Sequence, residues 1–207
     1  MKNYEHYFTE AVKRNYADHS NFLLTEINRN FNCISGDTAF ALTSGNPIDR
    51  RLDLCAYFLA LIKTLDEQGE SFDAIRQIYL EVAIDYTRPK SKIQALLRQL
   101  PAKLTNTWLA GIFLIAFDKK VGRKAHPDGF RAKIITNKKE TFGLGYGFDI
   151  LECGICKLFK KYNYEKYVSI LCEVDEITSH LAGLKLVRTG TITSGAEKCD
   201  FRFEKEK

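Results

Sequence analysis

The residues in this sequence with the widest range of possible chemistry are its cysteines, and four of the six lie within residues 153–199. Cys153 and Cys156 form a C-x2-C pair, and Cys172 and Cys199 follow singly. Thiolates are the strongest nucleophiles and the softest metal ligands among protein side chains. The clustering therefore predicts that any thiol or metal chemistry lies in the C-terminal part, without deciding between the two.

Cys172 has the most suggestive neighbours among these cysteines. On a helix predicted from about residue 164 to 180, Cys172 and Asp175 lie one turn apart, and a second acid and a serine continue the same face. The carboxylate could exchange protons with the thiol, and Arg188 or His180 could supply a cation that offsets the acids. The alternative is that Cys172 is a small buried residue and that the acids face solvent.

The C-x2-C pair has three possible roles. Cys153 and Cys156 are half of a structural zinc site, but the other half would need a second close pair, and Cys172 and Cys199 are 27 positions apart. The pair could instead be a redox dithiol, although no thioredoxin-like order of elements surrounds it. Zinc bound by some of these four cysteines, redox chemistry, and packing around a single functional thiol all stay open.

Bulk properties narrow the class of protein. The 207 residues carry a net charge of +5 with dispersed lysines and no nucleic-acid recognition motif, so we expect no nucleic-acid partner. The polar N-terminus lacks a signal-like apolar stretch, and the longest apolar run, residues 108–117, is shorter than the roughly 20 residues of a membrane span. We therefore predict a soluble, cytoplasmic protein without a membrane partner and with reduced cysteines.

Hydrophobic periodicity predicts that the first 120 residues are mainly helical. Residues 28–46 are rich in Asn, Ser and Gly and are followed by Pro47, which predicts a long loop or an irregular excursion. Gly69 ends one helix, and Ser71 is the expected N-cap of the next, which Pro89 stops. The predicted helices cover about residues 2–18, 49–69, 72–88, 91–100 and 105–119.

The pattern changes after Gly122 to strands mixed with helices. Strands are expected at 130–136 and 146–152, helices from 154 and from 164, and then strands at 185–193 and 198–204 joined as a hairpin by a Ser194-Gly195 turn. The order β-β-α-α-β-β after a helical first half predicts an α+β fold with a mostly antiparallel four-stranded sheet. We expect one domain, residues 1–207, with a helical portion (1–121) and an α+β portion carrying the site (122–207).

An ordered set of short motifs in the C-terminal portion resembles a known family. The motifs are Glu152-Cys153, Cys172-x2-Asp175, Arg188-Thr189-x-Thr191, Gly195, and Cys199-Asp200-Phe201-Arg202. Together they resemble the L-2-amino-thiazoline-4-carboxylic acid hydrolase family over about residues 146–204. The helical first half has a compatible size but no motif that can be aligned, and Cys156 has no place in the family pattern.

The resemblance implies a hydrolase that opens a thiazoline ring to an N-carbamoyl-cysteine product. The ring carbon bonded to sulfur and nitrogen is amidine-like and electrophilic, so the reaction needs a nucleophile and a proton donor. The resemblance assigns Cys172 or Cys199 as the nucleophile and Asp175 as the proton relay, with His180 as a further general-base candidate. An enzyme acting on a cyclic amidine or thiazoline is therefore the favoured interpretation.

Substrate binding, cofactors and assembly follow from the same resemblance. Arg188 is expected to anchor the substrate carboxylate, with Cys153 and Thr191 lining the same pocket. No cofactor is expected, and zinc bound by Cys153, Cys156, Cys172 or Cys199 is the alternative, activating water. The expected partner is a small-molecule substrate, and the oligomeric state is open, with a homodimer as one option.

Two other functions compete with the hydrolase. The layout resembles more faintly the small-molecule-binding domains related to vinyl reductase and haem-NO-binding proteins, which predicts a non-enzymatic binding or sensor domain with a Cys-lined pocket. A closed apolar pocket with separated thiols would favour that alternative. Convergence of Cys172, Cys199, Asp175 and Arg188 on one open cleft would favour hydrolysis, and mutual ligand reach of four cysteines would favour a structural zinc protein.

Overall fold

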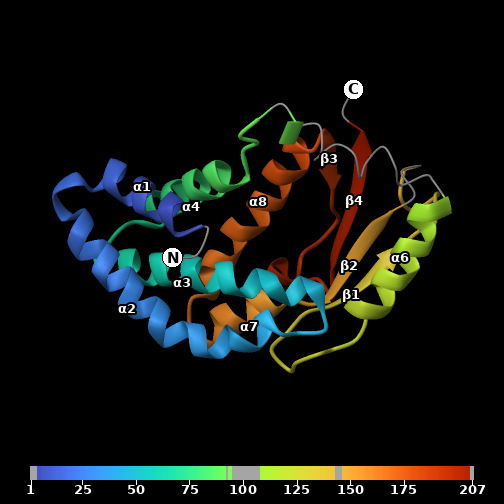
Figure 1. Ribbon diagram of the computed structural model, residues 1–207, viewed down its shortest axis with the longest axis horizontal. Helices are drawn as coiled ribbons and strands as arrows, with labels where there is room; N and C mark the ends of the chain where they lie inside the picture. The colour runs from blue at the N-terminus through green and yellow to red at the C-terminus, as the bar shows by residue number, and fades with distance from the viewer. Residues whose placement is uncertain (1–3, 92, 95–107, 143–145, 206–207) are drawn as a thin grey trace.

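The computed structural model describes residues 4–91, 93–94, 108–142 and 146–205, and it gathers helices at one end of the molecule and a sheet at the other (Figure 1). The helices are α1 (Glu5–Asn15), α2 (Ser20–Thr38), α3 (Arg51–Glu67), α4 (Phe72–Thr87), α6 (Trp108–Val121), α7 (Gly154–Lys161) and α8 (Val168–Leu181). Short 3-10 turns include η3 (Pro47–Arg50), which leads into α3, and η5 (Ile192–Ser194). Among the described residues, none of these helices has both the length and the apolar character needed to cross a membrane.

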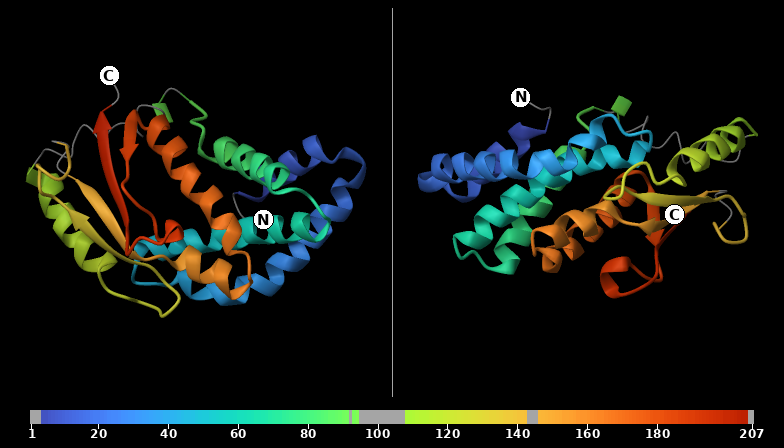
Figure 2. Two further views of the ribbon diagram at one scale, coloured as in Figure 1. Left: turned by 180° about the vertical axis from the view of Figure 1, so that it is seen from behind. Right: turned by 90° about the horizontal axis from the view of Figure 1, so that it is seen from below.

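The sheet of the described residues has four strands in the order β1-β2-β4-β3. They are β1 (Arg131–Ile135), β2 (Gly147–Glu152), β3 (Leu184–Val187) and β4 (Cys199–Lys205), and every neighbouring pair is antiparallel. Helix α6 lies beside β1 at one edge, and α8 lies beside β3 at the other (Figure 2). The predicted α+β fold, with helices first and an antiparallel sheet in the second half, is confirmed.

Capping and helix-ending residues in the sequence predicted several helix ends correctly. The Ser71 side chain accepts a hydrogen bond from the Ala74 N–H at 3.2 Å and caps α4, as its residue type predicted. Gly69 has a φ of +82°, a conformation that favours glycine and ends the preceding helix. The helix predicted at 91–100 falls almost wholly outside the described residues, and so do the first residues of the one predicted at 105–119.

The loop predicted at residues 28–46 was wrong over most of its length, because α2 runs through it to Thr38. Leu23, Ile27, Phe31 and Ile34 form a buried stripe at helical spacing on this helix. The polar residues that suggested a loop lie mostly on the exposed face, and the buried Asn30 amide donates to Thr64 at 2.9 Å. Burial of the apolar stripe outweighs the weak helix propensity of Asn and Ser.

The hairpin of β3 and β4 was predicted with the right pairing but with too short a connection. Strand β3 ends at Val187, well before the predicted end at 193. The Asp200 carboxylate accepts the Gly190 N–H at 3.0 Å and the N–H of the preceding residue, which draws this segment out of the ladder. Thr191 then caps η5, and Gly195 ends it with a φ of +87°. The connection is thus a structured excursion over α8 and not a tight turn.

Buried side chains form two apolar clusters that meet in the middle of the molecule. The larger cluster joins α1 to α4 with α7 and α8, and the smaller one lies between the sheet, α6 and the start of α3. Ile155, on the first turn of α7, packs against both clusters. The view from behind shows α8 and α3 running between the helical end and the sheet (Figure 2). Their surfaces converge without filling all the space between them, and the main cavity lies there.

Two fully buried polar residues in the turn before α3 hold the helical portion to the sheet. The Asn46 amide donates to the Phe130 carbonyl at 2.9 Å, and the Asp49 carboxylate accepts the Phe130 N–H at 2.8 Å. Gly129 lies so close to this carboxylate that a Cβ there would be 2.8 Å from an Asp49 oxygen. Because both backbone groups of Phe130 are satisfied by this turn, η3 and the start of α3 are fixed against β1.

We predict that Asp49→Ala lowers the free energy of unfolding by about 1–3 kcal/mol, because it leaves the buried Phe130 N–H without its acceptor. Asp128→Ala, in the exposed turn just before β1, is the matched control and is expected to change it by less than about 0.5 kcal/mol. Denaturant titration of both variants measures this. Equal effects of the two substitutions would show that the Asp49 contact does not hold the two portions together.

Candidate active site

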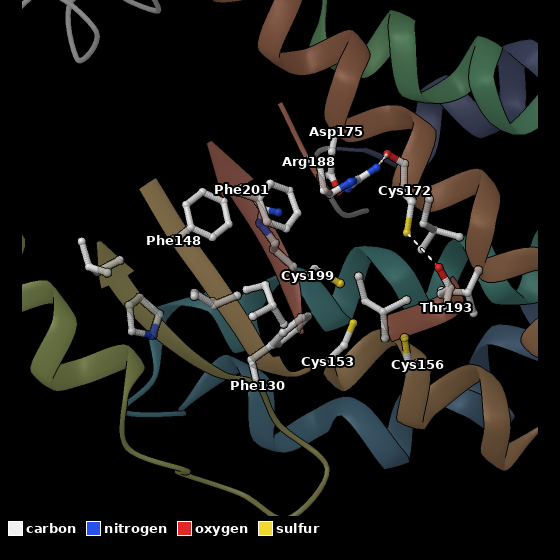
Figure 3. A pocket seen from close by; sticks show the side chains of 18 of the residues that line it. Phe130, Phe148, Cys153, Cys156, Cys172, Asp175, Arg188, Thr193, Cys199 and Phe201 are labelled. Atoms are coloured by element: carbon white, nitrogen blue, oxygen red, sulfur yellow. Dashed lines mark hydrogen bonds and ion pairs between the residues drawn. The ribbon is translucent and has the colours of Figure 1, made fainter. Parts of the chain in front are cut away.

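A cavity of about 360 Å³ lies where the two apolar clusters meet, and residues far apart in the sequence line it (Figure 3). Its walls come from η3 and the start of α3, from α6, from β1, β2 and β4, and from α7, α8 and the connection after β3. Small-molecule sites in proteins are mostly apolar cavities of roughly 300–1,000 Å³ with a few polar groups. This cavity has both the size and the composition of such a site.

All four C-terminal cysteines line this cavity. Cys153 is the N-cap of α7, and Cys156 lies in its first turn. Cys172 is on α8, and Cys199 is the first residue of β4. All six cysteines of the chain are free thiols. Tertiary packing therefore brings together thiols that are separated by as much as two helices and a strand.

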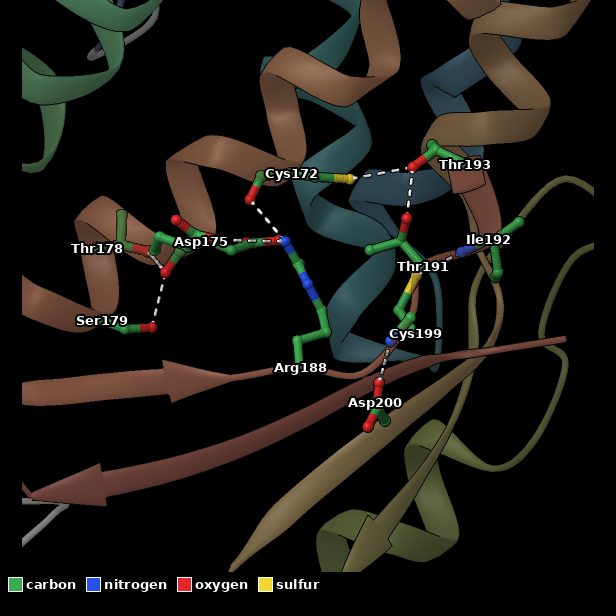
Figure 4. A network of polar contacts seen from close by, with 12 residues as sticks. Cys172, Asp175, Thr178, Ser179, Arg188, Thr191, Ile192, Thr193, Cys199 and Asp200 are labelled. Atoms are coloured by element: carbon green, nitrogen blue, oxygen red, sulfur yellow. Dashed lines mark hydrogen bonds and ion pairs between the residues drawn. The ribbon is translucent and has the colours of Figure 1, made fainter. Parts of the chain in front are cut away.

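Cys172 lies in the most polar surroundings of the four. Its Sγ is 3.7 Å from the Thr193 hydroxyl, and its backbone carbonyl accepts a hydrogen bond from Arg188 Nη2 at 3.2 Å (Figure 4). Burial raises the pKa of the Cys172 thiol to about 11, with the Thr193 contact opposing the shift. The free protein therefore holds this group as a neutral thiol near pH 7.

Cys199 is more enclosed and is fixed by a backbone contact. Its Sγ accepts the Ile192 N–H at 3.2 Å, and burial raises the pKa of its thiol. The side chain is 6% exposed, and in β4 it lies opposite Ile150. Its sulfur faces the same cavity as Cys172, but its position is set by the strand and by η5.

The C-x2-C pair forms a thiol couple at the start of α7. A hydrogen bond from Cys153 to Cys156 lowers the pKa of the Cys156 thiol, although burial opposes the shift. The same bond, together with burial, raises the pKa of Cys153. A thiol in the first turn of a helix also gains from the positive end of the helix dipole. Cys156 is therefore the cavity thiol that loses its proton most readily.

An acid and two cations border the thiols. Arg188 Nη1 is 3.4 Å from an Asp175 carboxylate oxygen, and its guanidinium lies 5.2 Å from the centre of the Phe201 ring. Burial raises the pKa of Asp175, against the opposing charges of Arg51 and Arg188. Arg188 is only 11% exposed and is already engaged, whereas Arg51 is exposed at the edge of the cavity. No ion pair of Arg51 is found within the described residues.

Thr191 and His180 lie outside the cavity lining. The Thr191 hydroxyl is 2.7 Å from that of Thr193, so Thr191 holds the residue that contacts Cys172 and does not itself line the cavity. His180 is exposed in the last turn of α8. Arg202, which follows Cys199 in the same motif, binds the buried Asp149 at 2.9 Å, away from the thiols.

No group of three or more His, Cys, Asp or Glu side chains within the described ranges is arranged to hold a metal ion. The four cavity cysteines share a wall, yet they do not form such a group. The zinc alternative considered for these cysteines therefore has no preformed site in this part of the chain.

Sequence reasoning missed three kinds of lining residue. Arg51 carries no motif and reaches the cavity only because η3 turns the start of α3 toward the sheet. Thr193 was assigned to a strand, and its role depends on the excursion after β3. The aromatic wall, which includes Phe130 and Phe148, reads in the sequence as ordinary strand core. Only alternation along β1 and β2 could have indicated a common face for these side chains.

The model of the L-2-amino-thiazoline-4-carboxylic acid hydrolase family matches residues 52–203, from α3 to β4, which is most of the chain. The chain belongs to this family. The match includes all four cavity cysteines, Asp175 and Arg188, and it begins one residue after Arg51. No curated protein and no solved structure gives a significant match.

Membership extends the resemblance well beyond the motifs of residues 146–204. The matched region starts in the first turn of α3 and ends within β4, so it takes in nearly all of α3, all of α4 and most of the sheet. The family name denotes a hydrolase of thiazoline carboxylic acids, which implies a small-molecule substrate. The cavity between the two clusters is a site of suitable size, and most of its lining residues fall in the matched region.

The thiol pKa directions predict an order of alkylation. In a Cys33→Ser background, which removes an exposed thiol, iodoacetamide at pH 8 should modify Cys156 first and Cys172 at least about tenfold more slowly. Cys55, buried with a pKa of about 12, should stay unmodified in the folded protein. Below pH 11 the rate at Cys172 should rise about tenfold per pH unit, because the thiolate fraction does. Peptide mass spectrometry gives each rate, and faster labelling of Cys172 than of Cys156 would contradict this order.

Proposed function

We propose that this protein hydrolyses a 2-amino-thiazoline-4-carboxylate to an N-carbamoyl-cysteine-type product, with the Cys172 thiol as the nucleophile. The observation that carries the proposal is that the Cys172 thiol, the Asp175 carboxyl group and the Arg188 guanidinium border one cavity. Family membership supports the same reaction class. Cys172 is preferred to Cys199 because its neighbours on the cavity wall are polar and ionisable, whereas the Cys199 sulfur is held by a backbone N–H.

The first half of the reaction forms a covalent intermediate. The Cys172 sulfur attacks the amidine-like carbon C2, and the thiol proton passes to the ring nitrogen, directly or through Asp175. The C2–S bond of the ring then breaks, and the departing sulfur takes a proton and becomes the free thiol of the product. The amidine group of the substrate is itself a base, so a Cys172 thiol that is neutral in the free protein can still be activated when substrate binds.

Water completes the second half. It adds to the same carbon, now joined to Cys172 as an isothiourea, and Asp175 accepts its proton. Collapse of the adduct forms the urea C=O bond and expels the Cys172 thiolate, which regains a proton. The net change is the addition of one water molecule to the substrate. A carboxyl group whose pKa is raised by burial suits this role, because it can both hold and release a proton nearer to neutral pH.

Two cations have separate roles in this proposal: Arg51 binds the substrate carboxylate, and Arg188 holds Asp175. Arg188 is paired with Asp175 and keeps it in place, whereas Arg51 is exposed, lines the cavity and has no ion pair among the described residues. Cys153 lines the wall, and Thr191 positions Thr193 against the Cys172 sulfur. His180 is assigned no step, because it lies outside the cavity lining.

A non-enzymatic ligand-binding domain is the second candidate. The raised pKa of Cys172 and the many apolar residues in the cavity favour it, because a binding site needs no ionised thiol. It differs from the hydrolase in one respect that can be measured. A binding domain leaves the thiazoline ring intact, and exchange of Cys172 for alanine would change its affinity only slightly.

Cys172→Ala is expected to lower kcat for ring opening at least about 1,000-fold, and Asp175→Asn about 100-fold, because they remove the nucleophile and the proton relay. Chromatographic detection of the carbamoyl product measures both. Cys33→Ala, which removes an exposed thiol far from the cavity, is the matched control and should retain full activity. Unchanged turnover by Cys172→Ala would refute the thiol mechanism.

The two arginines are expected to differ in the kinetic constant that they affect. Arg51→Met should raise KM about tenfold or more, because it removes a charge that binds the substrate carboxylate, and it should lower kcat less than Arg188→Met does, because Arg51 offsets the raised pKa of Asp175 without an ion pair to it among the described residues. Arg188→Met should lower kcat, since Asp175 loses its ion-pair partner and its pKa rises further. Steady-state kinetics of both variants test this, and the reverse pattern would exchange the two roles.

A further inference from the structure

The cavity has a second end that the ring-opening reaction does not use. Cys172, Asp175, Arg188 and Thr193 come from α8 and the connection after β3 and make one end polar. The other end is formed by α6, β1 and β2, where the lining residues are aromatic or branched aliphatic side chains (Figure 3). Phe148 points into this region from the sheet, away from the thiols.

The apolar end is continuous with the polar end. Phe148 and Phe201 lie opposite each other on β2 and β4, and their rings stack with centroids 4.4 Å apart. The Arg188 guanidinium lies over the Phe201 ring at 5.2 Å. A molecule in the cavity would therefore meet a cation, then a stacked aromatic pair, and then the aliphatic side chain of Ile134 on β1.

The size of the cavity exceeds what the parent substrate needs. A single five-membered ring with an amino and a carboxylate group is far smaller than a drug-sized ligand, whereas a cavity of about 360 Å³ falls within the range that holds one. Unfilled apolar space contributes nothing to affinity, but apolar atoms placed there are removed from water and strengthen binding. The space that the parent ring leaves empty therefore indicates a larger ligand with additional apolar atoms.

We propose that this cavity selects an anionic ligand that carries an aromatic or branched alkyl group, so that the substrate is a substituted amino-thiazoline carboxylate and not the unsubstituted ring. The substrate part of this inference rests on the proposed hydrolase function. The carboxylate and the reacting carbon occupy the polar end, and the substituent lies against Phe148, Phe201 and Ile134. Apolar contact with these side chains, rather than any further polar group, sets the preference.

Two ligand pairs test the two parts separately. The first pair is 4-phenylbutanoate and butanoate, whose affinities are measured by calorimetry and which need no catalysis. The second pair is 2-amino-thiazoline-4-carboxylate with and without a phenyl group on ring carbon 5, compared by kcat/KM. In each pair we expect the phenyl compound to be favoured at least about tenfold, as apolar burial of this extent allows.

Ile134→Trp fills the apolar end and should reduce both preferences to within about twofold. Lys133→Trp, on the exposed face of the same strand, is the matched control and should leave them unchanged. Ile134→Thr, which adds a hydroxyl group to the wall without adding bulk, should also weaken them and covers the case in which the tryptophan variant does not fold. Circular dichroism checks the fold of each variant.

The outcomes separate this inference from the proposed function. Equal affinity and equal kcat/KM within both pairs, with the parent ring still hydrolysed, would overturn the inference and leave the hydrolase standing. Phenyl preferences that survive Ile134→Trp and Ile134→Thr would overturn it as well. Tight, Ile134-dependent binding of phenylbutanoate without hydrolysis of either thiazoline would support the ligand class and refute the hydrolase.

Discussion

The structure depends on the attachment of one buried turn to the first strand. Asn46 and Asp49 satisfy the carbonyl and the N–H of Phe130, and they fix the start of α3 against the sheet. Buried polar groups strongly favour the one arrangement in which they are all paired, so this contact sets the relative position of the two apolar clusters. Side chains of two clusters held in this way cannot close on each other completely, and the cavity occupies the remaining space.

The same burial determines the chemistry of the cavity. Removal from water raises the pKa values of Cys172, Cys199 and Asp175, because burial disfavours the charged form of each group. Arg188 counters this effect for Asp175 and lies against the Phe201 ring, where little water competes for it. A substrate that brings its own basic amidine and its own carboxylate complements these groups. In the proposed reaction, the basic amidine of the substrate would therefore activate the neutral Cys172 thiol when the substrate binds.

The sequence predicted the class of fold and the region of the site because those features follow from local patterns. Alternation of apolar and polar residues predicted the strands, and Ser71 and Gly69 predicted helix ends. The spacing of Cys172 and Asp175 predicted that both lie on one face of the helix that is α8. The prediction failed for α2, where a buried stripe of four residues outweighs polar neighbours that are typical of loops. Propensity describes each residue alone, whereas burial depends on the partner surface that α3 supplies.

The parts of the site that could not be predicted from the sequence depend on tertiary structure alone. Arg51 becomes a lining residue because η3 is held to Phe130, and Thr193 does so because Asp200 draws the chain out of the β3 ladder. Neither contact can be predicted from a single sequence, because no residue pattern indicates which distant segments will pack together. The cysteines were found because their residue type is rare and reactive, although their ranking required the distances and surroundings that the fold provides.

The proposed mechanism depends on a covalent bond between the Cys172 sulfur and the substrate carbon. The most direct measurement is mass spectrometry of the Asp175→Asn variant, acid-quenched during turnover of 2-amino-thiazoline-4-carboxylate, because slow release of the intermediate lets it accumulate. The account predicts an added mass equal to that of the substrate on the peptide that contains Cys172. Turnover with the added mass on another cysteine, or on none, would contradict it.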